Sequence, residues 1–285
     1  MYAVTGITGQ VGGAVARALL ARHQPVRAVV RDAARAAPWT DRGADVAVAG
    51  LDDAQALSSA FADTQGVFVM LPANFDPAPG FPEARGLIGA IAQALAQARP
   101  PRVVALSTIG AQAAPENLLT QLGLLEDALG ALPLDVRFIR PAWFMENALW
   151  DVAPARDTGV IDAYLQPVER PIPMVATEDV GRTAAQMLLS PGDGPRMVEL
   201  AGPAPVSPAD IAAGLGALLG RPVRAQPVPR AEWEARFRQQ GAQHPGPRAR
   251  MLDGFNEGWL RFEGTARRGT VPLATVLDEL VTRAG

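Results

Sequence analysis

Apolar and glycine-rich stretches at the start of the chain follow an order that predicts strand, turn, helix and strand. An apolar run at 2–4 leads into a glycine-rich turn at 5–13. An Ala/Leu-rich helix then ends near Arg22, and a second apolar run follows at 26–30. Apolar runs joined by a helix in this way indicate a βαβ unit, whose two strands lie parallel in one sheet.

The same alternation continues to about residue 150. The predicted elements, in chain order, are strand 44–49, helix 54–61, strand 66–71, helix 81–98, strand 103–106, helix 116–129 and strand 136–140. Several of these strands are apolar throughout, which is typical of parallel strands buried on both faces. We therefore expect an α/β fold built on a doubly wound, parallel Rossmann sheet.

Beyond residue 150 the rhythm breaks and Pro and Gly become more frequent. The elements expected there are helix 177–189, strand 198–200, a helix from 207, strand 224–228, helix 230–239, a loop-rich stretch 244–270 and helix 272–283. Thr177-Glu178-Asp179 and Ser207-Pro208-Ala209-Asp210 are expected to cap their helices.

These patterns divide the chain into two parts. We expect an NAD(P)-binding Rossmann domain over 1–150 and a smaller, mixed substrate or lid lobe over 151–285. Residues 172–202 are expected to return to the Rossmann sheet.

The glycine turn has the spacing G-x-x-G-x-x-G. Gly6 permits a tight turn out of the first strand, and Gly9 lets the chain approach a ligand closely because it has no Cβ. Gly12 lets the following helix pack against the sheet. The N–H groups and the positive dipole end of that helix then face the ligand. In this strand–turn–helix context, the turn predicts a site for the pyrophosphate of a dinucleotide.

The second strand ends at Arg31, about 20 residues after the last glycine, where a dinucleotide fold contacts the adenosine ribose. The Arg31 guanidinium suits a 2′-phosphate, and Arg35 adds a second candidate contact. Asp32 instead favours NADH, because a carboxylate at this position could accept a hydrogen bond from a ribose hydroxyl. This local chemistry favours NADPH over NADH; the alternative is that both arginines are solvated surface charges.

Other segments follow the ends of predicted strands, where the ligand crevice of such a sheet lies. Leu71 and Pro72 are expected beside the cofactor. The Ser107 hydroxyl could contact the nicotinamide or a substrate oxygen, or equally bond to nearby backbone in a turn. Trp143 and Phe144 are expected to form a nicotinamide or substrate wall, or else to fill the seam between two lobes.

Composition removes several functional classes. The chain has 285 residues, a formal net charge of −3, no Cys and two His. No basic tract suggests nucleic acid. Without Cys, and with His23 and His244 far apart, no metal site is expected. No charged leader precedes the first strand and no apolar run reaches membrane-spanning length, so we expect a cytoplasmic protein without a membrane partner.

The chain contains no lysine, because all 26 basic residues are Arg. This excludes a Schiff base and the Tyr-x-x-x-Lys pair of ordinary short-chain reductases. Of the two tyrosines, Tyr2 is expected in the core. Tyr164, Ser107 and an ordered water are therefore the candidate proton donors.

Six motifs are informative together: Thr5-Gly-Ile-Thr-Gly-Gln-Val-Gly12, Arg27-Ala-Val-Val-Arg31, Leu125-Glu126 to Leu129, Arg140-Pro-Ala-Trp-Phe-Met-Glu-Asn147, Glu178-Asp-Val-Gly181 and Leu200-Ala-Gly-Pro203. In these the chain resembles NmrA-like proteins, a family of atypical short-chain dehydrogenases/reductases. The resemblance covers nearly the whole chain and is more specific for fold and nucleotide binding than for substrate. It implies NADPH on the glycine turn, with Arg31 near the 2′-phosphate.

Position and resemblance together define the expected sites. The cofactor-binding candidates are Gly6, Thr8, Gly9, Gln10, Val11, Gly12, Arg31, Arg35, Leu51, Asp52, Leu71, Pro72, Ser107, Pro141 and Phe144. The substrate-binding candidates are Phe75, Phe144, Asn147, Met174 and Phe255. Ser107 and Tyr164 are the catalytic candidates.

The chain departs from the family at two positions. The family often has a lysine before the Glu-x-x-Leu helix, and this chain has Gln121-Leu122-Gly123 there. The family also commonly has an Asp after the third strand, where this chain has Gly50, with Asp52 and Asp53 just beyond. We therefore expect adenine to be recognised through backbone groups.

Members of the family include NADPH-dependent quinone reductases, reductases of aromatic natural products, and regulators that bind the cofactor without turning it over. A quinone accepts hydride readily and its reduced anion takes a proton from water, so this reaction needs no lysine. We therefore expect reduction of a quinone or another activated small acceptor. The alternative is a non-catalytic NADP(H)-binding redox sensor with a protein partner, while an isomerase or epimerase is disfavoured without a Tyr/Lys pair.

Overall fold

β1 (Tyr2–Val4) lies within an eight-stranded sheet, and all three of its residues are buried. The computed structural model describes residues 1–190, 192 and 194–284. The strand order is β3-β2-β1-β4-β5-β6-β10-β12, and the pairings are parallel. The other strands are β2 (Val26–Val30), β3 (Asp45–Val48), β4 (Gly66–Val69), β5 (Val103–Leu106), β6 (Val136–Pro141), β10 (Met197–Ala201) and β12 (Arg267–Arg268). This confirms the expected doubly wound α/β sheet.

The direction of winding reverses between β1 and β4. The chain runs outward from β1 to β2 and β3, crosses back to β4, and continues to β5 and β6. In open α/β sheets, the loops at the carboxyl ends of the two strands that flank such a reversal leave a ligand crevice between them. In this protein these loops are the glycine turn after β1 and the segment after β4.

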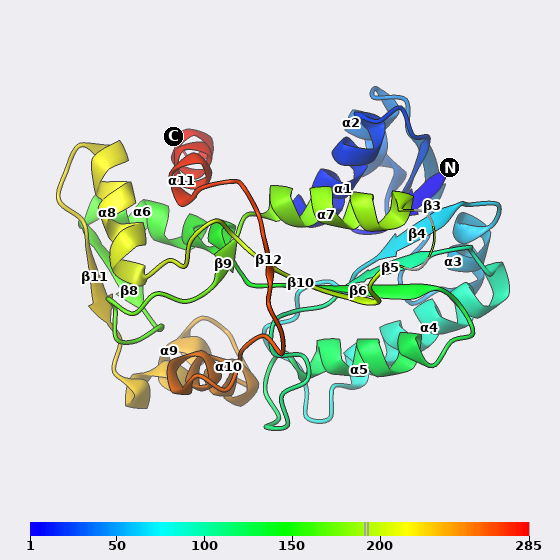
Figure 1. Ribbon diagram of the computed structural model, residues 1–285. Helices are drawn as coiled ribbons and strands as arrows, with labels where there is room; N and C mark the ends of the chain where they lie inside the picture. The colour runs from blue at the N-terminus through cyan, green and yellow to red at the C-terminus, as the bar shows by residue number, and fades with distance from the viewer. Residues whose placement is uncertain (191, 193, 285) are drawn as a thin grey trace.

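Helices cover both faces of the sheet (Figure 1). On one face lie α1 (Gln10–Leu20) and α7 (Thr177–Leu189), and on the other lie α3 (Ala54–Phe61), α4 (Pro82–Ala98) and α5 (Thr120–Gly130). A 3₁₀ turn, η1 (Ala33–Ala36), and the short α2 (Ala37–Thr40) follow β2.

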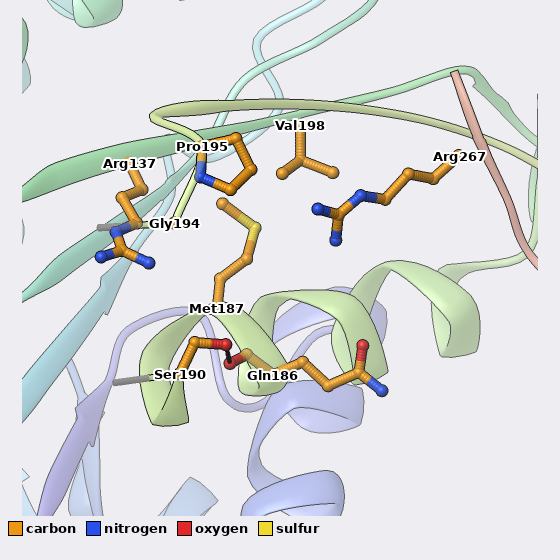
Figure 2. A pocket seen from close by; sticks show the side chains of 8 residues that line it. All are labelled: Arg137, Gln186, Met187, Ser190, Gly194, Pro195, Val198 and Arg267. Atoms are coloured by element: carbon orange, nitrogen blue, oxygen red, sulfur yellow. Dashed lines mark hydrogen bonds between the residues drawn. The ribbon is translucent and has the colours of Figure 1, made fainter. Parts of the chain in front are cut away.

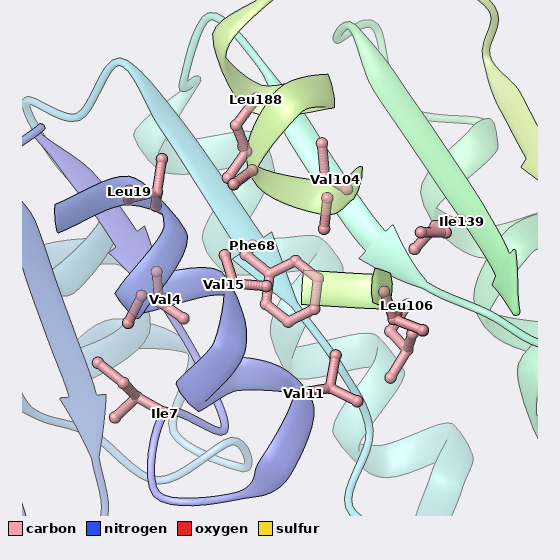
Figure 3. Close-up of a cluster of buried hydrophobic side chains, with 14 of the residues drawn as sticks. Val4, Ile7, Val11, Val15, Leu19, Phe68, Val104, Leu106, Ile139 and Leu188 are labelled. Carbon is pink, nitrogen blue, oxygen red and sulfur yellow. The ribbon is translucent and has the colours of Figure 1, made fainter. Parts of the chain in front are cut away.

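The apolar cluster under α1 and α7 fixes the start of α1 (Figure 3). Val11, Val15 and Leu19 recur every four residues, so they share the face that α1 turns to the sheet. They join a buried cluster that includes Phe68 of β4. Ile7, in the glycine turn, is 1% exposed and belongs to the same cluster. The turn is therefore held to the core by an apolar anchor rather than left as a loose loop.

α7 lies directly against α1. A Cβ on Gly181 would come within 2.3 Å of the Ala14 Cβ, so the helices approach this closely because residue 181 has no side chain. Arg17 and Glu178 form an exposed ion pair across the same contact, with 2.8 Å between Nη2 and Oε2. The seating of α1, and with it the glycine turn, therefore depends on Gly181.

After β6, α7, β10 and β12 return to the large sheet, and the other elements form a second lobe beside it (Figure 1). It contains two small parallel sheets, β7 (Trp143–Phe144) with β9 (Met174–Val175) and β8 (Val160–Ala163) with β11 (Arg224–Pro227). Its helical elements are η2 (Met145–Ala148), α6 (Leu149–Asp157), α8 (Pro208–Leu219), η3 (Arg230–Glu232), α9 (Trp233–Gln239), α10 (Gly246–Glu257) and α11 (Leu273–Arg283). Within residues 1–190, 192 and 194–284, we find no helix that is both long and apolar enough to cross a membrane.

Three local expectations were wrong. α5 begins at Thr120 rather than 116, because the Asn117 side chain accepts the Leu119 N–H at 2.8 Å and holds a turn. The stretch 244–270 contains α10, whose initial Gly246-Pro247 has the composition of a loop although proline suits a first helical turn.

The third concerns the start of α7. Its N-cap is Ala176, which has no side-chain cap, so the expected capping by residues 177–179 does not occur. The Asp179 carboxylate instead accepts the N–H groups of Thr270 and Val271, both at 2.9 Å, and ties the chain after β12 to α7. The cap at Ser207 is confirmed, since Ser207 and Asp210 form a reciprocal capping box.

We predict that Gly181→Ala destabilises the protein by roughly 1–3 kcal/mol, because the new methyl group overpacks the contact between α1 and α7. Gly86→Ala, in α4, is the matched control, since nothing lies within 4 Å of its Cβ position. It should raise stability by about 1 kcal/mol through helix propensity. Thermal unfolding measures both variants, and equal changes in Tm would contradict the packing argument.

Candidate functional site

The glycine turn is hydrogen-bonded to the end of the neighbouring strand β4. Gly6 has φ of +62°, a conformation that glycine adopts without strain. The Thr5 N–H donates to the Phe68 carbonyl at 3.0 Å, and the Thr5 hydroxyl accepts the Met70 N–H at 3.2 Å. The turn is thus aligned with the end of β4, across the point where the strand order reverses.

The turn also brings main chain unusually close to main chain. A Cβ on Gly12 would lie 2.3 Å from the Gly6 carbonyl oxygen, so only glycine fits there. Gly9 is the N-cap of α1 and offers no side-chain acceptor to the first N–H groups of the helix. Thr8, Gly9 and Gln10 are exposed, whereas the Val11 side chain is buried.

An uncapped and exposed helix start has N–H donors and a positive dipole end available to an anion. The exposed N–H groups at this helix start therefore suit an anion such as a diphosphate, while Gly12 lets the helix pack closely on the turn. The Met70 sulfur lies 2.6 Å from where a Gly6 Cβ would be, so a larger residue at position 6 would have to displace this side chain in addition to adopting a positive φ.

Arg31 directly follows β2, the strand that pairs with β1 through Ala28 and Val4, and Arg35 lies in the following turn η1. Both arginines are exposed. The Asp32 carboxylate accepts the Ala34 N–H at 2.9 Å and caps η1. One oxygen of the exposed Asp32 carboxylate is therefore engaged locally, whereas neither guanidinium group has a hydrogen-bond or ion-pair partner among the described residues.

The segment after β3 is folded back on itself. A Cβ on Gly50 would lie 2.4 Å from the Asp52 carboxylate, so Asp52 covers this glycine closely. Leu51 packs partly into the core under α3 and α4, and Asp53 caps α3 by accepting the Ala56 N–H at 2.9 Å. Asp52 is exposed at the same edge of the sheet.

Leu71 and Pro72 follow β4 as expected. Leu71 is 9% exposed and contributes to the core, whereas Pro72 is exposed. Pro141, at the end of β6, is buried, and its carbonyl accepts the Ile109 N–H at 2.8 Å.

Ser107 is buried at the end of β5 and belongs to a charged network. Its hydroxyl donates to Glu126 Oε1 at 2.5 Å. Arg140 donates to both oxygens of Glu126, at 2.8 and 2.6 Å, and also to Glu263. Burial opposes the charge of Arg140, but Glu126 and Glu263 outweigh it and raise the pKa of the guanidinium.

The network has a chemical consequence for Ser107. A carboxylate can only accept, so the single hydroxyl proton of Ser107 is directed away from the crevice toward Glu126. The oxygen keeps lone pairs for a ligand donor, such as an amide. As a proton donor, the expected role of Ser107 does not fit this geometry.

Gln121 occupies the region where the family often has lysine. Its buried side-chain amide donates to the carbonyls of Asn74 at 3.2 Å and Leu118 at 3.0 Å. It therefore holds the loops after β4 and β5 together and carries no charge. The missing lysine is evident from the sequence, whereas the bridging role of the amide is set by tertiary structure.

Tyr164 lies in the second lobe, where its ring packs 5.8 Å from Trp233 and 5.3 Å from Phe237. Burial, and then the negative charge of Asp162, raise the pKa of its phenol. A raised pKa makes Tyr164 a weaker acid. It also lines a surface hollow of about 480 Å³, together with Arg236 and others of α9.

The substrate candidates are placed unevenly. Phe75 is 43% exposed after β4, and Phe144 and Asn147 are half-buried in β7 and η2. Met174 is fully buried in β9, and Phe255 is 5% exposed with its ring edge-to-face on Trp143 at 5.3 Å. The structure therefore places Met174 and Phe255 in the core of the lobe and not on a ligand-facing surface.

Glu146 is a residue that sequence reasoning quoted without assigning it a role. Its Oε1 accepts both the N–H and the hydroxyl of Thr177, at 2.7 and 2.6 Å. Burial raises the pKa of this carboxyl, and its Oε2 has no partner among the described residues. Glu146 fixes η2 against the start of α7. It thereby positions Phe144 and Asn147, which lie close to Glu146 in the sequence.

A second hollow, of about 240 Å³, lies elsewhere (Figure 2). Its lining includes Arg137, Ser190 and Arg267. Arg137 is the second residue of β6, so this hollow is at the amino-terminal edge of the sheet, opposite the glycine turn. Across the described ranges 1–190, 192 and 194–284, no group of three or more His, Cys, Asp or Glu residues could hold a metal ion.

Comparison with known proteins agrees with this geometry. Residues 6–191 match the family described as NAD(P)H-binding. The chain belongs to this family. An NAD(P)H azoreductase of Xenophilus azovorans is 30% identical over 225 residues, which is 79% of this chain and 76% of the relative. Quinone oxidoreductase 2 of Escherichia coli strain K12 is 27% identical over 245 residues, 85% of this chain and 82% of the relative.

A solved structure shows the same fold over the whole chain. The NADPH-dependent quinone oxidoreductase QOR2 of Escherichia coli, complexed with NADPH, has a TM-score of 0.79 and 22% identity. The match covers 98% of this chain and 99% of that one. The resemblance to atypical short-chain reductases is confirmed, and this NAD(P)H-binding protein is related to NAD(P)H-dependent reductases.

Asp151, in the first turn of α6, gives the second lobe a pH-dependent stability. Burial, and then Asp162, raise the pKa of Asp151 from 3.8 to about 7. Between pH 3.8 and about 7, the folded protein therefore keeps a proton on Asp151 that the unfolded chain releases. The contribution of Asp151 to the free energy of unfolding thus falls as pH rises toward 7. We predict that Asp151→Asn, measured by thermal unfolding, gains Tm over the wild type through this window and keeps that gain above it.

The exposed Asp157→Asn, in the same helix, is the control, and its Tm difference from the wild type should change little over the same range. A difference for Asp151→Asn that does not vary with pH would show that Asp151 ionises normally.

Proposed function

We propose that this protein is an NADPH-dependent reductase that passes hydride to a quinone or another activated small acceptor. One observation carries the proposal: the exposed, uncapped start of α1 lies on a glycine turn at the reversal of strand order. Residues 1–150 would bind the cofactor, and the lobe over 151–285 would bind the acceptor.

The residues of the turn suit the cofactor's diphosphate, and Arg31 suits its 2′-phosphate. Backbone N–H groups at Gln10, Val11 and Gly12 are the donors of the first helical turn. Arg31 and Arg35 are exposed at the neighbouring strand end, and Asp32, the competing acid, is engaged in capping η1. This arrangement supports a preference for NADPH over NADH.

The chemistry of the sheet edge supports an activated acceptor. When bound, the nicotinamide supplies a hydride. Ser107 directs its proton to Glu126, Gln121 is neutral, and the raised pKa of Tyr164 makes it a poor acid. An acceptor whose reduced form takes its proton from water fits this edge better than a plain ketone. The names of the azoreductase and quinone oxidoreductase relatives support the same class.

We predict that Arg31→Ala lowers the affinity for NADPH roughly tenfold or more and leaves NADH binding nearly unchanged, because a charge-assisted contact to the 2′-phosphate is lost. Titration calorimetry with both cofactors measures the preference. Arg22→Ala, an exposed arginine just beyond the other end of α1, is the matched control and should keep it. An unchanged NADPH preference in Arg31→Ala would refute the 2′-phosphate role.

We also predict that the wild type oxidises NADPH in the presence of small quinones, with much slower turnover of plain ketones. Absorbance at the NADPH band follows the reaction, and binding of the cofactor is measured in parallel. Cofactor binding without turnover across a quinone and azo-dye panel would reject the reductase and leave the redox-sensing regulator.

A further inference from the structure

Arg248, near the start of α10, holds its guanidinium between two aromatic rings. Its Cζ lies 4.1 Å from the ring centroid of Phe237 and 5.7 Å from that of Phe75. The side chain is half-buried, and burial lowers the pKa of the guanidinium, opposed by the nearby Tyr164. A cation on aromatic faces and partly out of water gains most when an anion reaches it.

Neighbouring arginines of the lobe are already neutralised, and Arg248 is not. Arg230 lies 2.6 Å from Asp253, and Arg250 lies 3.5 Å from Glu257. Among the described residues, Arg248 forms no ion pair with a carboxylate. Its polar contact there is Gln240 Oε1, at 3.5 Å from Nη1. Arg248 therefore keeps a full positive charge for a ligand.

Hydrogen bonds hold Arg248 at the crevice edge of the sheet. Asp76, in the loop after β4, accepts two backbone N–H groups of the segment before α10, at 2.8 and 2.5 Å. The Leu118 N–H, in the segment after β5, donates to the Pro247 carbonyl at 2.9 Å. The loops that follow β4 and β5 thus meet the first turn of α10, which carries Arg248.

The surface next to the guanidinium is apolar and exposed. Phe75 is 43%, Leu149 42% and Trp150 58% exposed. Phe75 also packs edge-to-face on Trp150, with 5.9 Å between ring centroids. Phe75 therefore contacts both the charge and the second ring, and a flat aromatic molecule would find stacking partners directly beside a cation.

We propose that Arg248, Phe75 and Trp150 form a subsite for acceptors that carry an anionic group on an aromatic ring. The rings hold the flat body, and the planar guanidinium offers paired N–H donors to a sulfonate, phosphate or carboxylate. This inference rests on the proposed reductase function and names the class of acceptor that the same site prefers.

Naphthalene-2-sulfonate, which hydride does not reduce, tests the subsite apart from turnover. It is titrated into protein saturated with NADP⁺, so that cofactor phosphates do not compete, and is compared with the neutral naphthalene-2-sulfonamide. The wild type should bind the sulfonate roughly tenfold more tightly or better, because only the sulfonate forms charge-assisted bonds. Equal affinities overturn the proposal without the need for any variant.

Arg248→Met removes the charge and keeps an apolar stem, and should abolish the preference for the sulfonate. Arg250→Met, two residues along the same helix, is the matched control, because Arg250 also lies over an aromatic ring but has carboxylate partners. It should keep the preference. Loss of preference in both variants, or weaker NADPH binding in Arg248→Met, would contradict an acceptor subsite.

Turnover separates this inference from the reductase proposal. KM is measured for 1,4-naphthoquinone and for 1,4-naphthoquinone-2-sulfonate in the wild type and in Arg248→Met. An increase in KM of roughly tenfold for the sulfonated quinone alone supports the subsite. If both quinones react and neither KM changes, the subsite is wrong and the reductase stands. If neither reacts while sulfonate binding depends on Arg248, the reductase is wrong, and Arg248 marks a binding site for anionic aromatic molecules that are not acceptors.

Discussion

The unpaired N–H groups at the start of α1 are the constraint on which the rest of the structure depends. A helix end needs hydrogen-bond partners, and Gly9 supplies no side-chain acceptor. The surroundings keep this end in place: Ile7 anchors the turn in the core, Thr5 joins it to β4, and Gly181 lets α7 press on α1. The protein thus holds ready a rigid, positively polarised site whose natural partner is an anion.

A second constraint acts at the neighbouring strand ends. Arg140 and Glu126 are buried charges, which are costly unless each is fully paired, and Ser107 completes the pairing of Glu126. The same bonds join β5, α5 and β6 at the crevice edge. Because the Ser107 proton is used in this network, the network holds these strand ends in place but leaves Ser107 no proton to donate to a ligand. Under the proposed function, catalysis would rest on positioning hydride donor and acceptor, with solvent as the proton source.

Much of this fold could be predicted from the pattern of the chain. The βαβ start, the buried apolar strands and the Ser207 capping box each rest on local periodicity or on a local hydrogen bond, and the structure has them. α10 was missed because Gly246 and Pro247 serve a loop and a helix start equally well, and only packing decides between them. The glycine turn at the start of α1 was predictable, because the spacing of its glycines is a local sequence feature.

The remainder of the site depends on contacts between distant segments. Gln121 reaches Asn74, and Arg248 meets Phe75, across separations that no local pattern encodes. Met174 and Phe255 were chosen by position along the chain, and the packing of the second lobe buries them. Spacing identifies which strand end a residue follows, but the partner of its side chain is decided by tertiary structure.

Amide hydrogen exchange with and without NADPH tests the central claim most directly, because it reports where the cofactor covers the backbone. The account predicts strong protection at residues 6–13 and 31–35, with little change around the hollow lined by Arg137 and Arg267 at the opposite edge of the sheet. Saturating NADPH that leaves the glycine turn unprotected, or that protects the opposite edge instead, would contradict it.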